Sequence, residues 1–253
     1  MTSEPPVTAE EPEQLAAEPP TLLERQQALT MSAGYRAVAL MDRVKRIAYI
    51  FQANVAQYKS LVAKMHNLEF ALPILDIHNP GAHDDLLSEA ERLLHNVITA
   101  MSTRVDQQRA FMEKHFADDA VLTAEYRKRI ADTFLADLPT KFLKDLRNHI
   151  AHHLLPVAQS NQTYSSESFG FTFILPTAPL LEWDWTGRSV KDWISSQGDA
   201  VAIVDVVDDY ARKVGDFDKW LHDRIGLKFE AEIQEYWTAA EEFNRLVDRA
   251  FGV

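Results

Sequence analysis

Residues 38–65 read VALMDRVKRIAYIFQANVAQYKSLVAKM, and this stretch decides the fold class. Its apolar residues recur every three or four positions, the spacing at which side chains share one face of an α-helix. Helical spacing begins at about Leu22. It predicts a long helix that extends to about Met65. The stripe consists of Val38, Met41, Val44, Ile47, Ala48, Phe51, Val55, Tyr58 and Val62.

The same period continues after a break at Pro73 and the turn signal Asn79-Pro80-Gly81. It predicts a second long helix over about residues 84–116, a third over 120–135 and a fourth over 140–155, stopped by Pro156. The stripe expected to be buried on the second helix is Leu87, Ala90, Leu94, Val97, Met101, Val105 and Met112.

A period of two then replaces the helical period. Phe169, Phe171 and Phe173 alternate with small residues, and the apolar segment 180–183 follows two prolines. This pattern predicts a small two-stranded β-hairpin insertion over about residues 163–185. Gly198-Asp199 has the character of a helix stop followed by a new N-cap, and helical spacing predicts C-terminal helices over about residues 189–251.

The predicted fold is therefore mainly α, a helical bundle with a hairpin insertion and additional C-terminal helices. Residues 1–20 are rich in Pro, Glu and Ala, and they predict a disordered acidic tail because they offer almost no large apolar groups to bury. Residues 21–253 are expected to form a single helical domain.

Composition limits the function. The 253 residues contain no cysteine, which excludes disulfides, thiolate metal sites and cysteine nucleophiles. Only 8 glycines are present, and no phosphate-cradling Gly-rich loop, G-x-S-x-G or H-E-x-x-H motif occurs. The start has no secretory-signal pattern, and no apolar run is long enough to span a membrane. We expect a soluble cytoplasmic protein with no membrane partner.

The formal charge of −12 is unevenly distributed. Residues 1–20 carry five glutamates and no Lys or Arg, so they account for −5 and the remaining chain carries −7. Residues 120–160 run the other way, with six Lys or Arg against four acids. The overall acidity disfavours indiscriminate binding of nucleic acid, but this basic segment leaves room for a selective phosphate site.

The basic segment contains the densest site-like chemistry, Leu146-Arg147-Asn148-His149-Ile150-Ala151-His152-His153. On a helix, Asn148 shares a face with His152, four residues on, and His149 shares a face with His153. Arg147 and His152 are five residues apart, about 140° around the helix axis, so they border one groove without converging on a point. A second copy of this helix, packed alongside, would complete such a site.

Arg147-Asn148-x-x-x-His152 resembles the R-x(4–6)-H motif of the HEPN superfamily, in which a polar residue commonly follows the arginine. The helical context of about residues 35–156 is similar to the family's up-and-down bundle, whereas the hairpin and the last helices depart from it. The resemblance implies a homodimeric, metal-independent endoribonuclease of the toxin or defence type, acting on RNA and controlled by a cognate antitoxin or inhibitor protein. No cofactor or metal is implied.

The resemblance also implies roles for individual residues. His152 would act as general acid or base on the ribose 2′-OH or the leaving 5′-oxygen, and Arg147 would stabilise the charge of the pentavalent phosphate. Asn148 would orient the phosphate. Arg104 and Arg109 on the second helix are candidates to extend the substrate-binding groove, as are His149 and His153, which lie off the motif.

Alternatives remain open for each of these residues. Arg147 could pair with Asp145, and histidines in the last turns could merely complement the helix dipole. Arg104 and Arg109 could be exposed surface arginines. His149 and His153 have the spacing of two zinc ligands, with His78, His83, His95 and His115 as candidate third ligands.

The aromatic group Trp183, Trp185 and Trp193 could stack on bases, although a packing cluster that pins the insertion to the bundle is favoured. At the level of the whole chain, the alternatives to an enzyme are a non-catalytic HEPN-like module that binds a nucleotide, RNA end or protein, and a helical scaffold without an active site.

Overall fold

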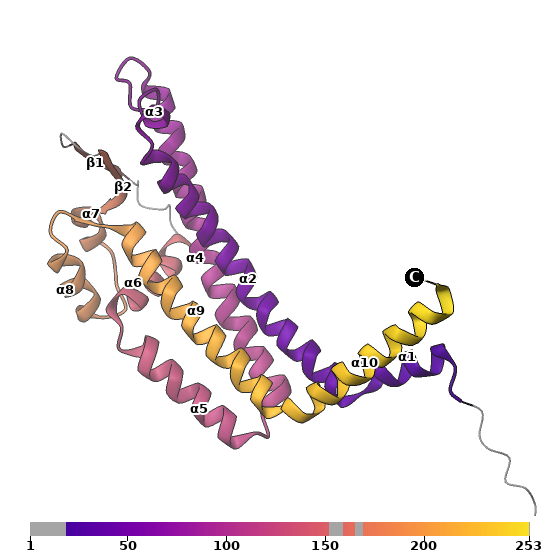
Figure 1. Cartoon of the computed structure of the whole chain (residues 1–253). Helices are drawn as coiled ribbons and strands as arrows, with labels where there is room; N and C mark the ends of the chain where they lie inside the picture. The colour runs from indigo at the N-terminus through magenta and orange to yellow at the C-terminus, as the bar shows by residue number, and fades with distance from the viewer. Residues whose placement is uncertain (1–18, 152–158, 165–168, 253) are drawn as a thin grey trace, which may run out of the picture. The chain divides into compact units, whose positions relative to one another are not determined.

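The computed structural model describes residues 19–151, 159–164 and 169–252, and it is mainly α, as the sequence predicts. Among the described residues, no helix combines the length and apolar character needed to cross a membrane. A five-residue π-helical turn, η1 (Ala131–Leu135), follows α5 directly. The α-helices are α1 (Leu22–Met31), α2 (Ala33–Met65), α3 (Leu68–Ala71), α4 (Pro80–Phe116), α5 (Ala120–Ile130), α6 (Leu138–Ile150), α7 (Thr177–Leu181), α8 (Arg188–Ser196), α9 (Ile203–Lys228) and α10 (Glu230–Phe251) (Figure 1).

Contacts between residues divide the chain into two compact units. The larger unit comprises Ala39–Lys228, and the smaller one combines the described residues up to Val38 with those from Phe229 onward. The single domain expected over residues 21–253 stays a prediction. The disordered tail expected at residues 1–20 falls outside the described residues, apart from Pro19 and Pro20.

The core of the larger unit lies among its long helices α2, α4 and α9, which run alongside one another (Figure 1). Phe51 of α2, Leu94 of α4 and Val214 of α9 are fully buried in one apolar cluster. The stripe predicted on residues 38–65 is confirmed where it packs against this core, because Val44, Phe51 and Tyr58 are all buried. The helical segment is interrupted at Ser32, where the backbone is extended.

The buried stripe of α4 differs from the prediction in its C-terminal half. Val105 is 37% exposed, whereas Arg104 and Gln108 occupy the buried positions. The reason is an acidic partner on another helix, Asp218 of α9, which accepts hydrogen bonds from both side chains. A buried charge of this kind is tolerated only when it is paired, and sequence periodicity gives no sign of that pairing.

The strand predicted around residues 169–173 is present in a hairpin, but its partner precedes it instead of following it. β1 (Gln159–Tyr164) pairs antiparallel with β2 (Phe169–Pro176), and the short β3 (Ala200–Val201) pairs with the other edge of β2. Phe171 and Phe173 are buried, which confirms the period-two pattern. The segment 180–183, expected in the hairpin, instead ends α7 and follows it.

The new N-cap expected at Asp199 is also absent. Its backbone carbonyl accepts a hydrogen bond from Thr177 N–H at 2.9 Å, and β3 intervenes before α9 begins at Ile203. Gly198 does adopt the left-handed conformation typical of a helix stop, with φ of 77°.

Helix α6 carries Arg147 and Asn148 of the motif. Asp137 caps its N-terminus by accepting hydrogen bonds from the backbone N–H and the hydroxyl of Thr140, at 3.0 and 2.6 Å. Lys213 of α9 donates to the same carboxylate at 2.6 Å, which ties the start of α6 to α9. The helix extends to Ile150, and residues 152–155 of the predicted helix lie outside the described residues. His152, His153 and Pro156 lie outside the described residues.

The smaller unit is built around α1 and α10, which run antiparallel beside each other (Figure 1). Arg25 of α1 forms an ion pair with Glu242 of α10 at 3.6 Å. A Cβ atom added to Gly34 would overlap the backbone carbonyl of Glu232 and lie 2.5 Å from Tyr236 Cβ. Only glycine therefore permits this close approach between the start of α2 and α10.

Candidate functional site

A groove of about 520 Å³ runs along α6 in the larger unit. One of its walls is polar and comes from α6, with Thr140, Lys141, Lys144, Arg147 and Asn148. The facing wall is largely apolar and aromatic, and it is contributed by α4, α5, η1 and α9. That wall includes Met101, Val105, Tyr126, Ile130, Phe134, Leu135, Tyr210 and Phe217.

The cations of the polar wall form a row along the helix. Lys141, Lys144 and Arg147 follow one another at three-residue intervals, so each is displaced from the last by a rise of about 4.5 Å. Lys144 and Arg147 are exposed, and Lys141 is half-buried. Within the described ranges, no carboxylate lies at ion-pair distance from any of the three. The row therefore presents three positive charges that a bound anion can use.

Arg147 and Asn148 both line the groove. The Arg147 guanidinium donates a long hydrogen bond of 3.4 Å to the Asn148 side-chain oxygen. The alternative pairing of Arg147 with Asp145 is wrong. Asp145 is buried and accepts hydrogen bonds from the backbone N–H and the hydroxyl of Thr186, at 3.1 and 2.5 Å.

Arg104 lies at the groove but is not an exposed arginine. It is only 3% exposed, it forms a buried ion pair with Asp218, and its guanidinium lies 5.8 Å from the centre of the Phe217 ring. The interpretation of Arg104 as a surface arginine is therefore wrong. The Asp218 carboxylate compensates the charge of Arg104. The pair therefore links α4 to α9 within the wall of the groove.

Arg109 lies at the rim of the same groove and matches the surface interpretation. Its side chain is 64% exposed, and its guanidinium is 3.7 Å from the Asp106 carboxylate one turn earlier. An exposed pair at this distance contributes little to stability and leaves the arginine able to reorient.

Two phenols add hydrogen-bonding groups to the aromatic wall. Burial raises the pKa of Tyr210 to about 12, and burial likewise raises the pKa of Tyr126. Both side chains therefore remain protonated at neutral pH and can act as neutral donors.

His149 faces away from the groove. Its ring stacks on Trp183 at a centroid distance of 3.3 Å and an interplanar angle of 8°, and it is not among the lining residues. Trp183 stacks in turn on Trp185, which packs against Phe142 of α6 at 5.3 Å. The tryptophan group is thus a packing cluster, as predicted, and Asp145 with Thr186 secures the same segment to α6.

His152 of the motif and the neighbouring His153 lie outside the described residues, so the helix faces expected for them stay predictions. Elsewhere, His83 is hydrogen-bonded to Ser160 at 3.0 Å, and His115 packs on Phe111. Within the described ranges, no three His, Asp or Glu side chains gather as metal ligands would.

Sequence reasoning missed two pairs of residues that line the groove. Lys141 and Lys144 carry a detectable signal, because they share the motif's helix at regular three-residue spacing. Phe134 and Leu135 reach the groove from the π-helical turn, for which residues 131–135 give no recognisable pattern. Turns of this kind occur frequently at functional sites.

No protein-family model, curated protein or solved structure matches this chain. The function is therefore argued from the residues of the groove.

Proposed function

We propose that this chain is a HEPN-like RNA-binding protein that acts as a metal-independent endoribonuclease of the toxin or defence type. The main support for this proposal is the composition of the groove. One wall presents Lys141, Lys144, Arg147 and Asn148, and the opposite wall presents aromatic residues. Cations in a row suit successive phosphates of a strand, and aromatic faces suit unstacked bases. The groove thus offers both elements that single-stranded RNA requires.

In the proposed reaction, the 2′-oxygen of a ribose attacks the adjacent phosphorus while a base removes the 2′-OH proton. The bond to the 5′-oxygen then breaks, and that oxygen takes up a proton. His152 is proposed for proton transfer, and Arg147 for stabilising the charge on the phosphate oxygens, to which its planar guanidinium can donate two hydrogen bonds. The products are a 2′,3′-cyclic phosphate and a 5′-hydroxyl.

The proposed site includes a second copy of α6, as the resemblance to the HEPN motif implies. A homodimer through the motif helix is therefore part of the proposal, as is an inhibitor protein that controls the activity. The exposure of Lys144, Arg147 and Asn148 supports this arrangement, because these side chains are accessible to a partner or a substrate.

A binding module without catalysis is the second candidate. The described lining of the groove contains five cations, two amides, two phenols and the Asp106 carboxylate but no histidine, and the excess of cations suits phosphate binding on its own. Arg147 and its neighbours would then hold a nucleotide or an RNA end.

The test is cleavage of a mixed RNA pool in the presence of a chelator. The wild type is expected to produce fragments with cyclic phosphate ends, and Arg147→Ala and His152→Ala are each expected to abolish them while remaining folded. Arg188→Ala, at an exposed arginine on α8, is the matched control and should cleave normally. RNA binding without any cleavage would select the second candidate, and neither binding nor cleavage would refute both.

A further inference from the structure

We propose that the wall of the groove opposite α6 contains a base-recognition subsite, which selects a pyrimidine of the bound RNA strand. The inference rests on the proposed function, because it names the base that the strand places there. The subsite consists of four residues that line the groove and carry hydrogen-bonding groups, and we call them the base subsite. They are Arg104, Gln108, Tyr126 and Tyr210.

Asp218 orients the two α4 members of the base subsite. Because the ionised carboxylate can only accept hydrogen bonds, the Gln108 amide turns its Nε2 toward Asp218, at 3.0 Å. The amide oxygen Oε1 is then left as a fixed acceptor, and it has no hydrogen-bond partner among the described residues. Arg104 donates to Asp218 through Nε and Nη2, which leaves the N–H groups of Nη1 as donors.

The two phenols of the base subsite are nearly buried and lack partners. Tyr126 is 9% exposed and Tyr210 is 5% exposed. Within the described ranges neither hydroxyl makes a hydrogen bond, yet neither oxygen is sealed from solvent. Burial raises the pKa of each phenol, so both remain protonated donors at neutral pH. Since both residues line the groove, their hydroxyls are available to a polar group that enters it.

Aromatic rings surround these polar groups. The Phe217 ring lies 5.7 Å from the Tyr126 ring and 5.7 Å from the Phe134 ring, measured between centroids. Phe134 lies 5.9 Å from Tyr210 in turn. Flat apolar faces beside unpartnered donors and an acceptor suit a flat ring with polar atoms on its edge, which is the chemistry of an unstacked nucleobase.

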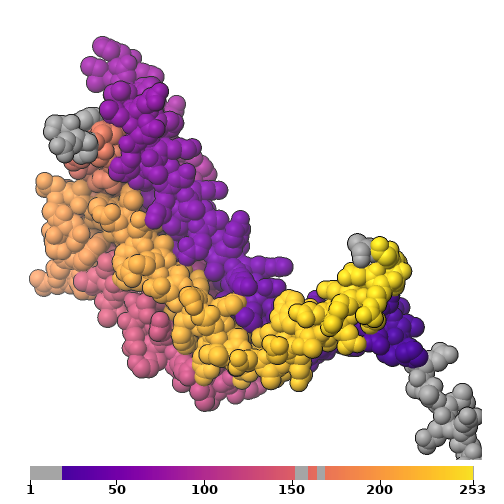
Figure 2. All heavy atoms as spheres, viewed as in Figure 1, coloured from indigo at the N-terminus to yellow at the C-terminus, as the bar shows by residue number. Residues whose placement is uncertain are grey.

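The helices that carry the two phenols are fixed to each other. Arg224 of α9 pairs with Glu125 of α5 at 2.6 Å, and Lys228 of α9 pairs with Asp119 at the start of α5 at 2.6 Å. The space-filling view shows α5 in pink and α9 in orange in contact along the visible face (Figure 2). The base subsite is therefore held in place before a ligand binds, which reduces the entropic cost of binding.

The balance of donors and acceptors in the base subsite favours a pyrimidine. The two phenols and Arg104 Nη1 can donate, whereas Gln108 Oε1 is a fixed acceptor. Uracil and cytosine each present two acceptors and one donor group on their Watson–Crick edges. Guanine presents one acceptor and two donor groups there, and adenine presents one of each. A pyrimidine therefore uses more of the donors that the base subsite offers.

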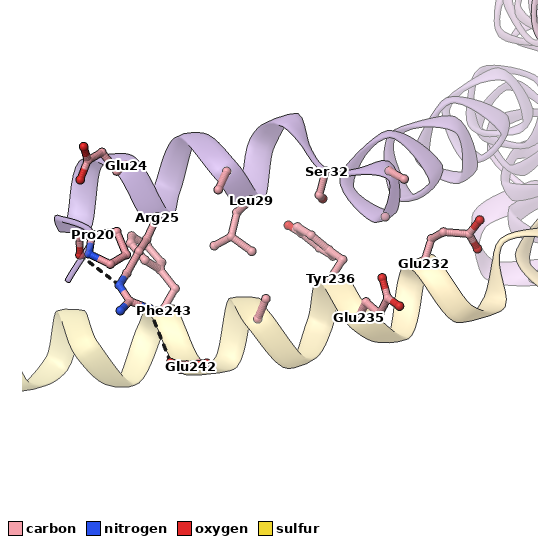
Figure 3. Close-up of a pocket in the computed structure, with 14 residues that line it drawn as sticks. Pro20, Glu24, Arg25, Leu29, Ser32, Glu232, Glu235, Tyr236, Glu242 and Phe243 are labelled. Atoms are coloured by element: carbon pink, nitrogen blue, oxygen red, sulfur yellow. Dashed lines mark hydrogen bonds and ion pairs between the residues drawn. The ribbon is translucent and has the colours of Figure 1, made fainter. Parts of the chain in front are cut away.

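The cavity of the smaller unit has the opposite character. This space of about 470 Å³ lies between α1 and α10, and Arg25 is its cation, already paired with a glutamate at 3.6 Å (Figure 3). Its acidic lining residues are Glu24, Glu232, Glu235 and Glu242. Such a lining repels a phosphate backbone, so base recognition is assigned to the groove on α6.

The test measures the affinity of the full-length chain for labelled oligomers of equal length and charge, with a chelator present. The probes are oligo(U), oligo(C), oligo(A) and an abasic ribose-phosphate oligomer, all with 2′-O-methyl groups so that none can be cleaved through a 2′-OH. The wild type should bind oligo(U) and oligo(C) at least about tenfold more tightly than oligo(A), the discrimination typical of a specific base contact.

The double variant Tyr126→Phe/Tyr210→Phe keeps both rings and removes only the hydroxyls. It should bind the pyrimidine oligomers no more tightly than oligo(A), with its affinity for the abasic oligomer unchanged. Each single variant should lose part of the preference, which keeps the test valid if thermal unfolding shows that the double variant does not fold. Tyr49→Phe, at a tyrosine that is 71% exposed on α2, is the matched control and should keep the full preference.

Two failures can be told apart. If the wild type binds all four probes alike, or if the folded phenylalanine variants keep the wild-type preference, the base subsite is overturned. In that case, weaker binding of the abasic oligomer by Arg147→Glu than by the wild type would leave the proposed phosphate groove standing. If no probe binds the wild type, the proposed RNA binding and the base subsite are both overturned.

Discussion

The carboxylate of Asp145 accepts two hydrogen bonds from Thr186, one from the backbone N–H at 3.1 Å and one from the hydroxyl at 2.5 Å. This contact has two consequences for the groove. It fixes the segment that follows α7 to the buried face of α6, and it occupies the carboxylate that stands closest in sequence to Arg147. Arg147 is left facing the groove with Asn148 as its hydrogen-bond partner.

Removing this contact should destabilise the larger unit. Asp145→Ala leaves the Thr186 groups without their acceptor, and we expect a loss of about 1–3 kcal/mol in the free energy of unfolding. Urea denaturation of Lys144→Ala provides the control, because Lys144 is exposed on the same helix and should change stability by less than about 0.5 kcal/mol. Equal midpoints for the two variants would contradict the role assigned to Asp145.

Gly34 should be intolerant of any side chain. Gly34→Ala places a methyl group against the Glu232 carbonyl and Tyr236 Cβ, so α10 must move away from the start of α2. We expect a loss of about 1–3 kcal/mol, measured by thermal unfolding. Gly81→Ala is the control, since nothing lies within 4 Å of an added Cβ there, and it should be neutral or slightly stabilising. A similar loss for both would refute the close approach.

The buried pair of Arg104 and Asp218 should respond differently from an exposed pair on the same helix. Asp218→Ala leaves the Arg104 charge buried without its partner, and we expect a cost of about 3–5 kcal/mol. Asp223→Ala removes the exposed partner of Lys219 and should cost no more than about 1 kcal/mol. Chemical denaturation of both variants distinguishes the two cases, and a small effect at Asp218 would contradict the burial of this pair.

Stability should fall as the pH drops below the usual histidine range. Burial lowers the pKa of His115, and the cations of Lys114 and Arg43 lower it further. The unfolded chain takes up this proton as the pH falls through 6.5, whereas the folded chain does so only at lower pH. The stabilisation that neutral His115 contributes is therefore complete above pH 6.5 and is lost on acidification. His115→Gln should flatten the dependence of the melting temperature on pH, and an unchanged dependence would exclude this histidine.

Much of the helical fold follows from periodicity, because α2, α4 and α9 each bury a stripe that is mostly apolar, interrupted by Arg104 and Gln108 on α4 and by Asp218 on α9. The sequence could not reveal Arg104 at a buried position, since its partner Asp218 is 114 residues away. β1 was missed because its residues are polar and lack alternation. The tryptophan cluster was predictable from the density of aromatic residues around the insertion.

The candidate site could be predicted only where its residues are close together in the sequence. Arg147 and Asn148 come from a local motif, and the lysines follow on the same helix. The aromatic wall depends on α4, η1 and α9 meeting at α6, which only the tertiary structure determines. His149 lies on the opposite side because Trp183 offers it a stacking surface.

We propose that the groove on α6 binds an RNA strand through its row of cations. The most direct measurement is the affinity for labelled single-stranded RNA, with a chelator present, over a series of salt concentrations. Arg147→Glu should weaken binding by at least about tenfold and reduce the salt dependence, because a phosphate contact is replaced by repulsion. Arg188→Glu makes the same charge change at an exposed site on α8. Its affinity for the RNA should be higher than that of Arg147→Glu and close to that of the wild type. Equal affinity for the wild type and Arg147→Glu, or no RNA binding by the wild type, would contradict RNA binding at this groove.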